Sequence, residues 1–92
     1  MYMDKGMDTG DMISKEIVEI SDEDTAETLH DKLQKISVSL LEKTIPTIIN
    51  GTNDRIKQDN EKATYAYNVS REEEHVDFNK NKEDIYNQIR GL

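Results

Sequence analysis

The sequence predicts an α/β chain in which a short strand and a long helix are followed by a linker and the opening of a second domain. Three observations predict this order. β-branched apolar residues recur in 12–20 between turn formers, apolar side chains recur at helical spacing from residue 29, and polar residues dominate 52–70. We therefore expect boundaries at 1–51, 52–70 and 71–92.

Residues 12–20, MISKEIVEI, form the expected strand. Ile13 and Ile17 fall on one face of an extended segment, so the strand should pack on at least one side. The Tyr-Met pair at 2–3 is interpreted as the end of a preceding strand. The two strands would then flank the aspartate-rich loop at 3–11.

A long helix should follow this strand. Asp24 is a good N-cap, and Glu27 three residues later completes a capping-box pattern. One apolar stripe comprises Leu29, Leu33, Ile36 and Leu40. Pro46 removes a backbone donor and predicts a kink or a short restart. Asn50-Gly51 is a plausible helix end.

The linker at 52–70 lacks a helical stripe, although its later part contains several β-formers. After it, Val76 and Phe78 alternate as in a short strand. A second helix should then begin with Asn81 as its N-cap.

Composition and charge limit the possible functions. The chain has 92 residues, only 34% of them hydrophobic, and a net charge of −8. A surface this acidic repels phosphates, so the chain alone should not bind nucleic acid tightly. Cysteine is absent, which excludes a disulfide framework, and no apolar run reaches the length of a membrane span. Without a signal-peptide pattern, we expect a cytoplasmic protein with no membrane partner.

So sparse an apolar content leaves a domain of this length marginally stable. The chain is therefore interpreted as part of something larger or as an obligate oligomer. The apolar face of the helix at 25–50 is the surface through which a shortened chain would associate with itself.

The loop at 3–11, MDKGMDTGD, places three aspartates and two glycines in nine positions. Both residue types form turns, so a solvated turn is the simplest interpretation. A calcium loop fails on spacing, because Gly6 occupies a ligand position and Thr9 the glycine position. His30 is interpreted as a surface histidine, because no second metal ligand lies three or four residues away. We expect no metal site.

Three stretches resemble one family. The loop at 3–11 is similar to the M-D-x-G-x-D-T-G-D loop of the methionyl-tRNA formyltransferases, and DTAETLHDKL at 24–33 resembles their D-T-x-x-T-L-x-x-K-L helix start. KATYAYNVSREEEHVDF at 62–78 and NQIRGL at 87–92 resemble their linker and the start of their C-terminal domain. Other formyltransferases that use 10-formyltetrahydrofolate share the first motif, whereas the A-T-Y-A linker is more particular to the tRNA enzymes.

The resemblance implies a fold. Residues 1–51 would be the C-terminal part of a Rossmann-like formyltransferase domain, arranged strand, loop, strand and long helix. Residues 71–92 would begin a barrel-type second domain.

The resemblance also implies a reaction, the transfer of a formyl group from 10-formyltetrahydrofolate to the amino group of methionyl-initiator tRNA. The family's catalytic trio is an Asn, a His and an Asp, and the aspartate falls on Asp8. The loop backbone at Gly6, Met7 and Asp8 would border the pterin pocket. The tRNA would bind through regions mostly outside this chain.

The family's Asn-x-His pair does not occur in this sequence. We therefore expect a central piece of the enzyme that is inactive by itself. Two alternatives remain open from the residues. One is a folate-dependent formyltransferase with another acceptor, such as a purine precursor or an amino sugar. The other is a non-catalytic acidic interaction module.

Overall fold

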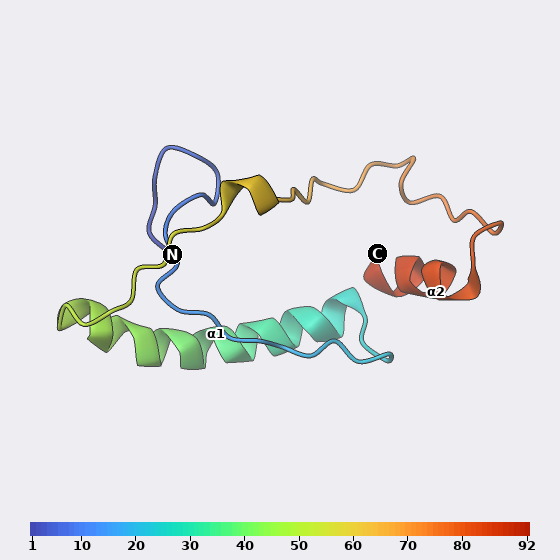
Figure 1. Cartoon of the computed structure of the whole chain (residues 1–92). Coiled ribbons are helices and arrows are strands. Elements are labelled where there is room, and N and C mark those ends of the chain that lie inside the picture. The colour runs from blue at the N-terminus through green and yellow to red at the C-terminus, as the bar shows by residue number, and fades with distance from the viewer.

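Two α-helices and one short 3₁₀ turn are the regular elements of the chain. The computed structural model describes all of residues 1–92. Helix α1 covers Ala26–Ile49, η1 covers Asn60–Lys62, and α2 covers Lys82–Gly91. Figure 1 shows α1 along one long side of the molecule, the N-terminal loop and the linker along the other, and α2 near the start of α1.

Helix α1 begins one residue later than the sequence predicts. Its N-cap is Thr25, whose hydroxyl accepts from the Thr28 N–H, while the Thr28 hydroxyl accepts from the Thr25 N–H. The prediction of Asp24 as N-cap, paired with Glu27, was wrong. The Asp24 carboxylate instead bonds to the turn before the helix and to Lys32.

The end of α1 lies where the sequence predicts it. Asn50 is the C-cap and its N–H donates to the Pro46 carbonyl over 3.0 Å, while Gly51 adopts a positive φ of 70°. That conformation suits glycine, which has no Cβ to clash with the backbone. Pro46 lies inside the last turn and the helix continues to Ile49, so the predicted restart is absent.

The start of α2 is also confirmed. Asn81 is its N-cap and its side-chain oxygen accepts from the Asp84 N–H over 2.8 Å. Ile85 is half-buried, whereas Ile89 is 56% exposed. The apolar face of α2 is therefore only partly buried.

The structure contains no β-strand, so the strands predicted at 2–3, 12–20 and 76–78 are not confirmed. Met12 forms a single antiparallel bridge with Ile56 of the linker. Ile17 is 83% exposed. A strand satisfies its backbone groups through a neighbouring strand, and beyond Met12 this chain provides no such neighbour.

The chain lacks an apolar core. Its only buried residues are Gly10 and Asp24, and no hydrophobic side chain is buried. The radius of gyration is 17.2 Å, against about 12 Å for a compact domain of this length. Much of α1 is consequently exposed on its apolar side, at Leu33, Val38, Leu41, Ile45, Ile48 and Ile49.

Neither helix is long and apolar enough to cross a membrane.

Candidate functional site

The aspartate-rich loop is closed by its own backbone and by one carboxylate. The Tyr2 N–H donates to the Asp11 carbonyl over 2.9 Å and joins the two ends of the loop. Within it, the Asp4 carboxylate accepts from the Thr9 hydroxyl and from the Gly6 N–H, the latter over 3.0 Å. These two bonds, the Thr9 bond first, hold the pKa of Asp4 below its usual value. Asp4 therefore shapes the turn.

Asp8 lies at the exposed side of this loop. Its φ is +56°, the only positive value outside glycine in the chain. Asp residues tolerate this left-handed conformation better than most others. Its single hydrogen bond within the chain is accepted by its backbone carbonyl, so its carboxylate is free to meet an external group.

Both loop glycines lie at close approaches. A Cβ on Gly10 would lie 1.7 Å from the Tyr2 carbonyl oxygen, and one on Gly6 would lie 2.3 Å from the Thr9 hydroxyl oxygen. The first contact is with backbone, which cannot rotate away. Gly10 therefore permits the crossing of the two ends of the loop.

The first part of the linker contacts this crossing. The Asn53 side-chain amide donates to the Tyr2 hydroxyl over 2.7 Å. Arg55 forms an ion pair with Asp11 at 2.7 Å, and its guanidinium lies 4.1 Å from the centre of the Tyr2 ring. The hydrogen bond to Asp11 raises the pKa of Arg55. Residues predicted to be a plain linker are thus attached to the loop.

Gln58 makes a further attachment. Its Nε2 donates to the Asp8 carbonyl over 2.9 Å and to the Gly10 carbonyl over 2.6 Å. Two residues before it, Ile56 exchanges backbone hydrogen bonds of 2.7 and 2.9 Å with Met12. The linker therefore follows the outer edge of the loop.

A hollow of about 660 Å³ lies between the loop and the linker. The loop contributes Met7, Asp8 and Thr9, and the linker contributes Tyr65 and Tyr67. The two tyrosine rings are stacked, with centroids 6.1 Å apart and planes 22° from parallel. Aromatic faces with a carboxylate at one edge suit a flat polar ligand.

Only part of the predicted site borders this hollow. Met7 and Asp8 line it and Gly6 does not. Neither histidine of the chain is there. His30 lies in a hollow beside the start of α1, and His75 lies beside Arg71 and Glu72.

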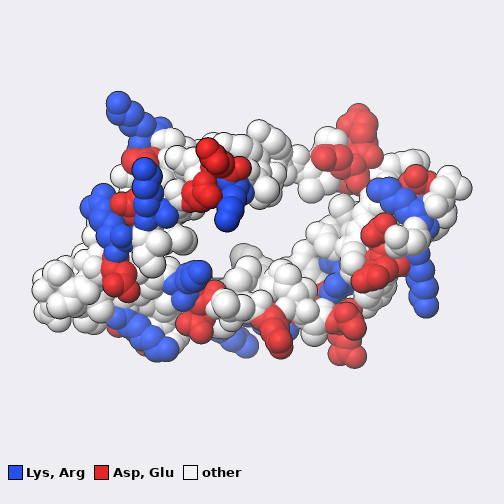
Figure 2. Space-filling view, viewed as in Figure 1, with Lys and Arg blue, Asp and Glu red and all other residues white.

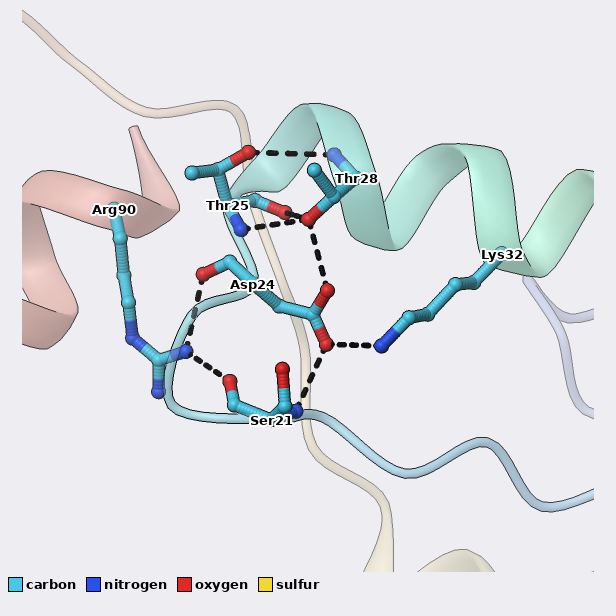
Figure 3. Close-up of polar contacts among 6 residues, drawn as sticks. All are labelled: Ser21, Asp24, Thr25, Thr28, Lys32 and Arg90. Atoms are coloured by element: carbon cyan, nitrogen blue, oxygen red, sulfur yellow. Dashed lines mark hydrogen bonds and ion pairs between the residues drawn. The ribbon is translucent and has the colours of Figure 1, made fainter.

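A second polar cluster joins α2 to the start of α1 (Figure 3). The Asp24 carboxylate accepts from the Lys32 ammonium at 2.5 Å, the Ser21 N–H at 2.8 Å and the Thr28 hydroxyl at 2.9 Å. These bonds, that of Lys32 first, hold the pKa of Asp24 well below its usual range. Arg90 donates to the Ser21 and Asp24 carbonyls over 2.6 and 3.0 Å. The satisfied carboxylate indicates a structural role.

No three His, Cys, Asp or Glu side chains gather closely enough to hold a metal ion. The three aspartates of the loop therefore do not form a common cluster.

Comparison with known proteins supports the resemblance carried by the motifs. The family model described as formyl transferase matches residues 1–45. Methionyl-tRNA formyltransferases of Bacillus velezensis, a Geobacillus species and Staphylococcus epidermidis are 54%, 52% and 49% identical to this chain over 92 residues, all of it. The chain is therefore similar in sequence to methionyl-tRNA formyltransferases along its whole length.

The chain spans about three-tenths of the length of these methionyl-tRNA formyltransferases, between 29% and 30% of each. The resemblance predicted from the loop, the helix start and the linker is thereby confirmed. The family model covers the aspartate-rich loop and the residues after it up to residue 45, and neither histidine of the chain borders the hollow beside Asp8.

Gln58 and Arg55, which both bond to the aspartate-rich loop, are residues that the sequence does not single out. Both lie in a polar stretch without periodicity, which predicts only a linker. The nearest signal was the β-former content of residues 63–69, which predicts an extended path along a neighbour. That segment does contribute Tyr65 and Tyr67 to the hollow.

Proposed function

We propose that this chain supplies the aspartate loop for the transfer of a formyl group from 10-formyltetrahydrofolate to the amino group of methionyl-initiator tRNA. The observation that carries the proposal is the 54% identity over the whole chain to a protein named methionyl-tRNA formyltransferase. The free carboxylate of Asp8, at the edge of a hollow, gives that similarity a chemical basis.

Asp8 is proposed as the catalytic carboxylate. Formyl transfer passes through a tetrahedral intermediate that bears an oxyanion, and the attacking amine must lose protons. A carboxylate beside a histidine favours the imidazolium form, orients the ring and holds a water molecule for proton relay. Asp8 is exposed and unpaired, so it is available for this contact with a histidine supplied from outside the chain.

The formyl donor is proposed to lie against the backbone of Gly6, Met7 and Asp8. Met7 and Asp8 line the hollow in this structure, and Gly6 shapes the turn behind them. Tyr65 and Tyr67 provide apolar area on the linker side. In a longer chain, we propose that residues 12–20 pair as a strand with neighbours that these 92 residues do not include, within a Rossmann-like domain.

The tRNA is proposed to bind mainly through other regions of the enzyme. The net charge of this chain is −8, and on the face drawn in Figure 2 the basic side chains are interspersed with acidic ones. Such a surface gives little attraction for a phosphate backbone. Because the proposed substrate serves translation, we expect the reaction in the cytoplasm.

The proposal is tested by transplanting the chain. Its 92 residues replace the corresponding segment of the Bacillus subtilis methionyl-tRNA formyltransferase, which is 51% identical to it. We expect the hybrid enzyme to formylate methionyl-initiator tRNA with 10-formyltetrahydrofolate, and we expect the separate 92-residue chain to be inactive. A folded hybrid that formylates only a purine precursor or an amino sugar would contradict the proposal.

For the separate chain, we also propose association through the apolar face of α1. The observation that favours it is the exposure of this face, with Leu41 57% and Ile45 48% exposed. Burying such side chains stabilises a complex by about 1.5–3 kcal/mol each.

A further inference from the structure

The side-chain nitrogen of Gln58 donates hydrogen bonds to two backbone carbonyls of the aspartate-rich loop. The acceptors belong to Asp8 and Gly10, which lie on either side of Thr9. Carbonyl oxygens only accept hydrogen bonds, so the chemistry requires the amide NH₂ group at this place. An amide NH₂ group has two N–H donors, one for each acceptor.

The two bonds come from a segment that is distant in sequence. Gln58 lies 50 residues from Asp8 and 48 from Gly10. Its side chain is half-buried, and the Met12–Ile56 bridge fixes the backbone two residues before it. The linker thus presents the amide from a defined position.

The loop depends on such a contact. Asp8 has a φ of +56°, a conformation that is uncommon outside glycine although aspartate adopts it more readily than most residues. Such a conformation persists when surrounding contacts hold it. The Asp8 carbonyl is the group at this residue that the rest of the chain binds.

We propose that Gln58 is a positioning residue that holds Asp8 at the edge of the hollow. This inference rests on the proposed function, because it acts through the catalytic role of Asp8. It assigns the linker a part in the active site, in addition to joining two domains.

The test uses the hybrid enzyme and the substitution Gln58→Glu. The carboxylate keeps the length of the side chain but places an oxygen against two carbonyl oxygens. A displacement of about 1 Å in a catalytic group costs up to roughly 100-fold in rate, so we expect kcat to fall roughly 10- to 100-fold. The change in KM should be smaller.

Gln88 provides a matched control. Its Nε2 also donates to two carbonyls, those of Glu73 and His75, over 3.1 and 3.0 Å. Gln88, Glu73 and His75 do not border the hollow beside Asp8. Gln88→Glu should therefore leave kcat within about threefold of the parent hybrid.

A double-mutant cycle separates positioning from general destabilisation. If Gln58 acts through Asp8, Gln58→Glu should lower kcat by less than about threefold when Asp8 is already Asn. Hydrogen exchange should meanwhile become faster in residues 1–12 of the Gln58→Glu enzyme and not of the Gln88→Glu enzyme. Full additivity of the two rate losses would overturn the inference.

The outcomes distinguish the inference from the proposed function. If Asp8→Asn inactivates the enzyme but Gln58→Glu keeps kcat within threefold of the parent, only the inference is refuted. If Asp8→Asn retains full activity, both the proposed function of Asp8 and the inference fail.

Discussion

At the scale of single residues, the three aspartates of the loop make different contacts. Asp4 accepts two hydrogen bonds inside the turn, and Asp11 pairs with Arg55 of the linker. Asp8 is bonded only through its backbone. A carboxylate with satisfied neighbours supports structure, whereas an unpaired one is available to a substrate or a catalytic partner. Asp8 is therefore the residue on which activity should depend.

Asp8→Asn should lower the kcat of the hybrid enzyme by about 10²–10⁴-fold, which is the usual contribution of acid–base assistance. Binding of the tRNA should change little. Steady-state kinetics and a tRNA filter-binding measurement test this. Asp31→Asn, an exposed position on α1, is the control. An Asp8→Asn enzyme within a factor of three of its parent would remove Asp8 from the reaction.

Gly10→Ala should destabilise the loop, because the new methyl would meet the Tyr2 carbonyl at 1.7 Å. Overpacking of this kind costs typically about 1–3 kcal/mol. The melting temperature of the hybrid enzyme should fall. In Gly91→Ala, where no atom lies within 4 Å of the new methyl, it should stay constant or rise. Equal melting temperatures for both variants would show that the loop ends do not cross closely in solution.

At the scale of the element, the start of α1 depends on polar bonds more than on apolar packing. Thr25 and Thr28 cap the helix, and Asp24 joins Ser21 to Lys32 (Figure 3). Arg90 of α2 donates to carbonyls of the same turn. No buried hydrophobic residue supports this junction. Its stability should accordingly follow the charge of Asp24.

The pKa of Asp24 is lowered from 3.8 in the folded chain, mainly by Lys32. A lowered carboxylate pKa contributes stability that is complete above 3.8 and is lost as the pH falls toward the folded value. We expect the urea midpoint of the hybrid enzyme to decrease below about pH 4, less so in Asp24→Asn. Asp31→Asn is the matched control and should behave as the parent. Identical acid profiles for Asp24→Asn and the parent would exclude this role.

At the scale of the whole molecule, α1 is a long amphipathic helix with little to pack against. Its stripe of Leu29, Leu33, Ile36 and Leu40 is at best half-buried. The loop and linker meet on one side of the molecule (Figure 1), and α2 bonds to the turn before α1 and to the carbonyls of Glu73 and His75. The chain therefore has polar junctions without an apolar centre. Domain stabilities are about 5–15 kcal/mol, and such an amount cannot come from so few buried groups.

The separate 92-residue chain should be largely unfolded or associated through α1. Circular dichroism and sedimentation at micromolar concentration test this. If it associates, Leu41→Glu should reduce its mass toward that of a monomer, because Leu41 is 57% exposed on this face. Glu42→Gln is a surface control on the same helix. A monomer that melts cooperatively would favour an independent acidic module over the formyltransferase segment.

The ends of the helices were predictable because capping is local. Asn81 lies next to the helix that it caps, and Asn50-Gly51 ends α1 within a few residues. The resemblance to methionyl-tRNA formyltransferases was also predictable, because the M-D-x-G-x-D-T-G-D loop is a contiguous motif. The choice of Thr25 over Asp24 as the N-cap of α1 was not predictable, because the Asp24 side chain bonds instead to Ser21 and Lys32.

The sequence by itself determined the amphipathic helix, its end, the second cap and the aspartate loop with Asp8. Only the tertiary structure decided what the loop contacts. The hydrogen bonds from Gln58 to the loop and the Met12–Ile56 bridge join residues more than 40 positions apart. No local pattern encodes such a pairing. The predicted strands are absent for the same reason. A helix satisfies its backbone within its own segment, whereas a strand requires a second segment beside it.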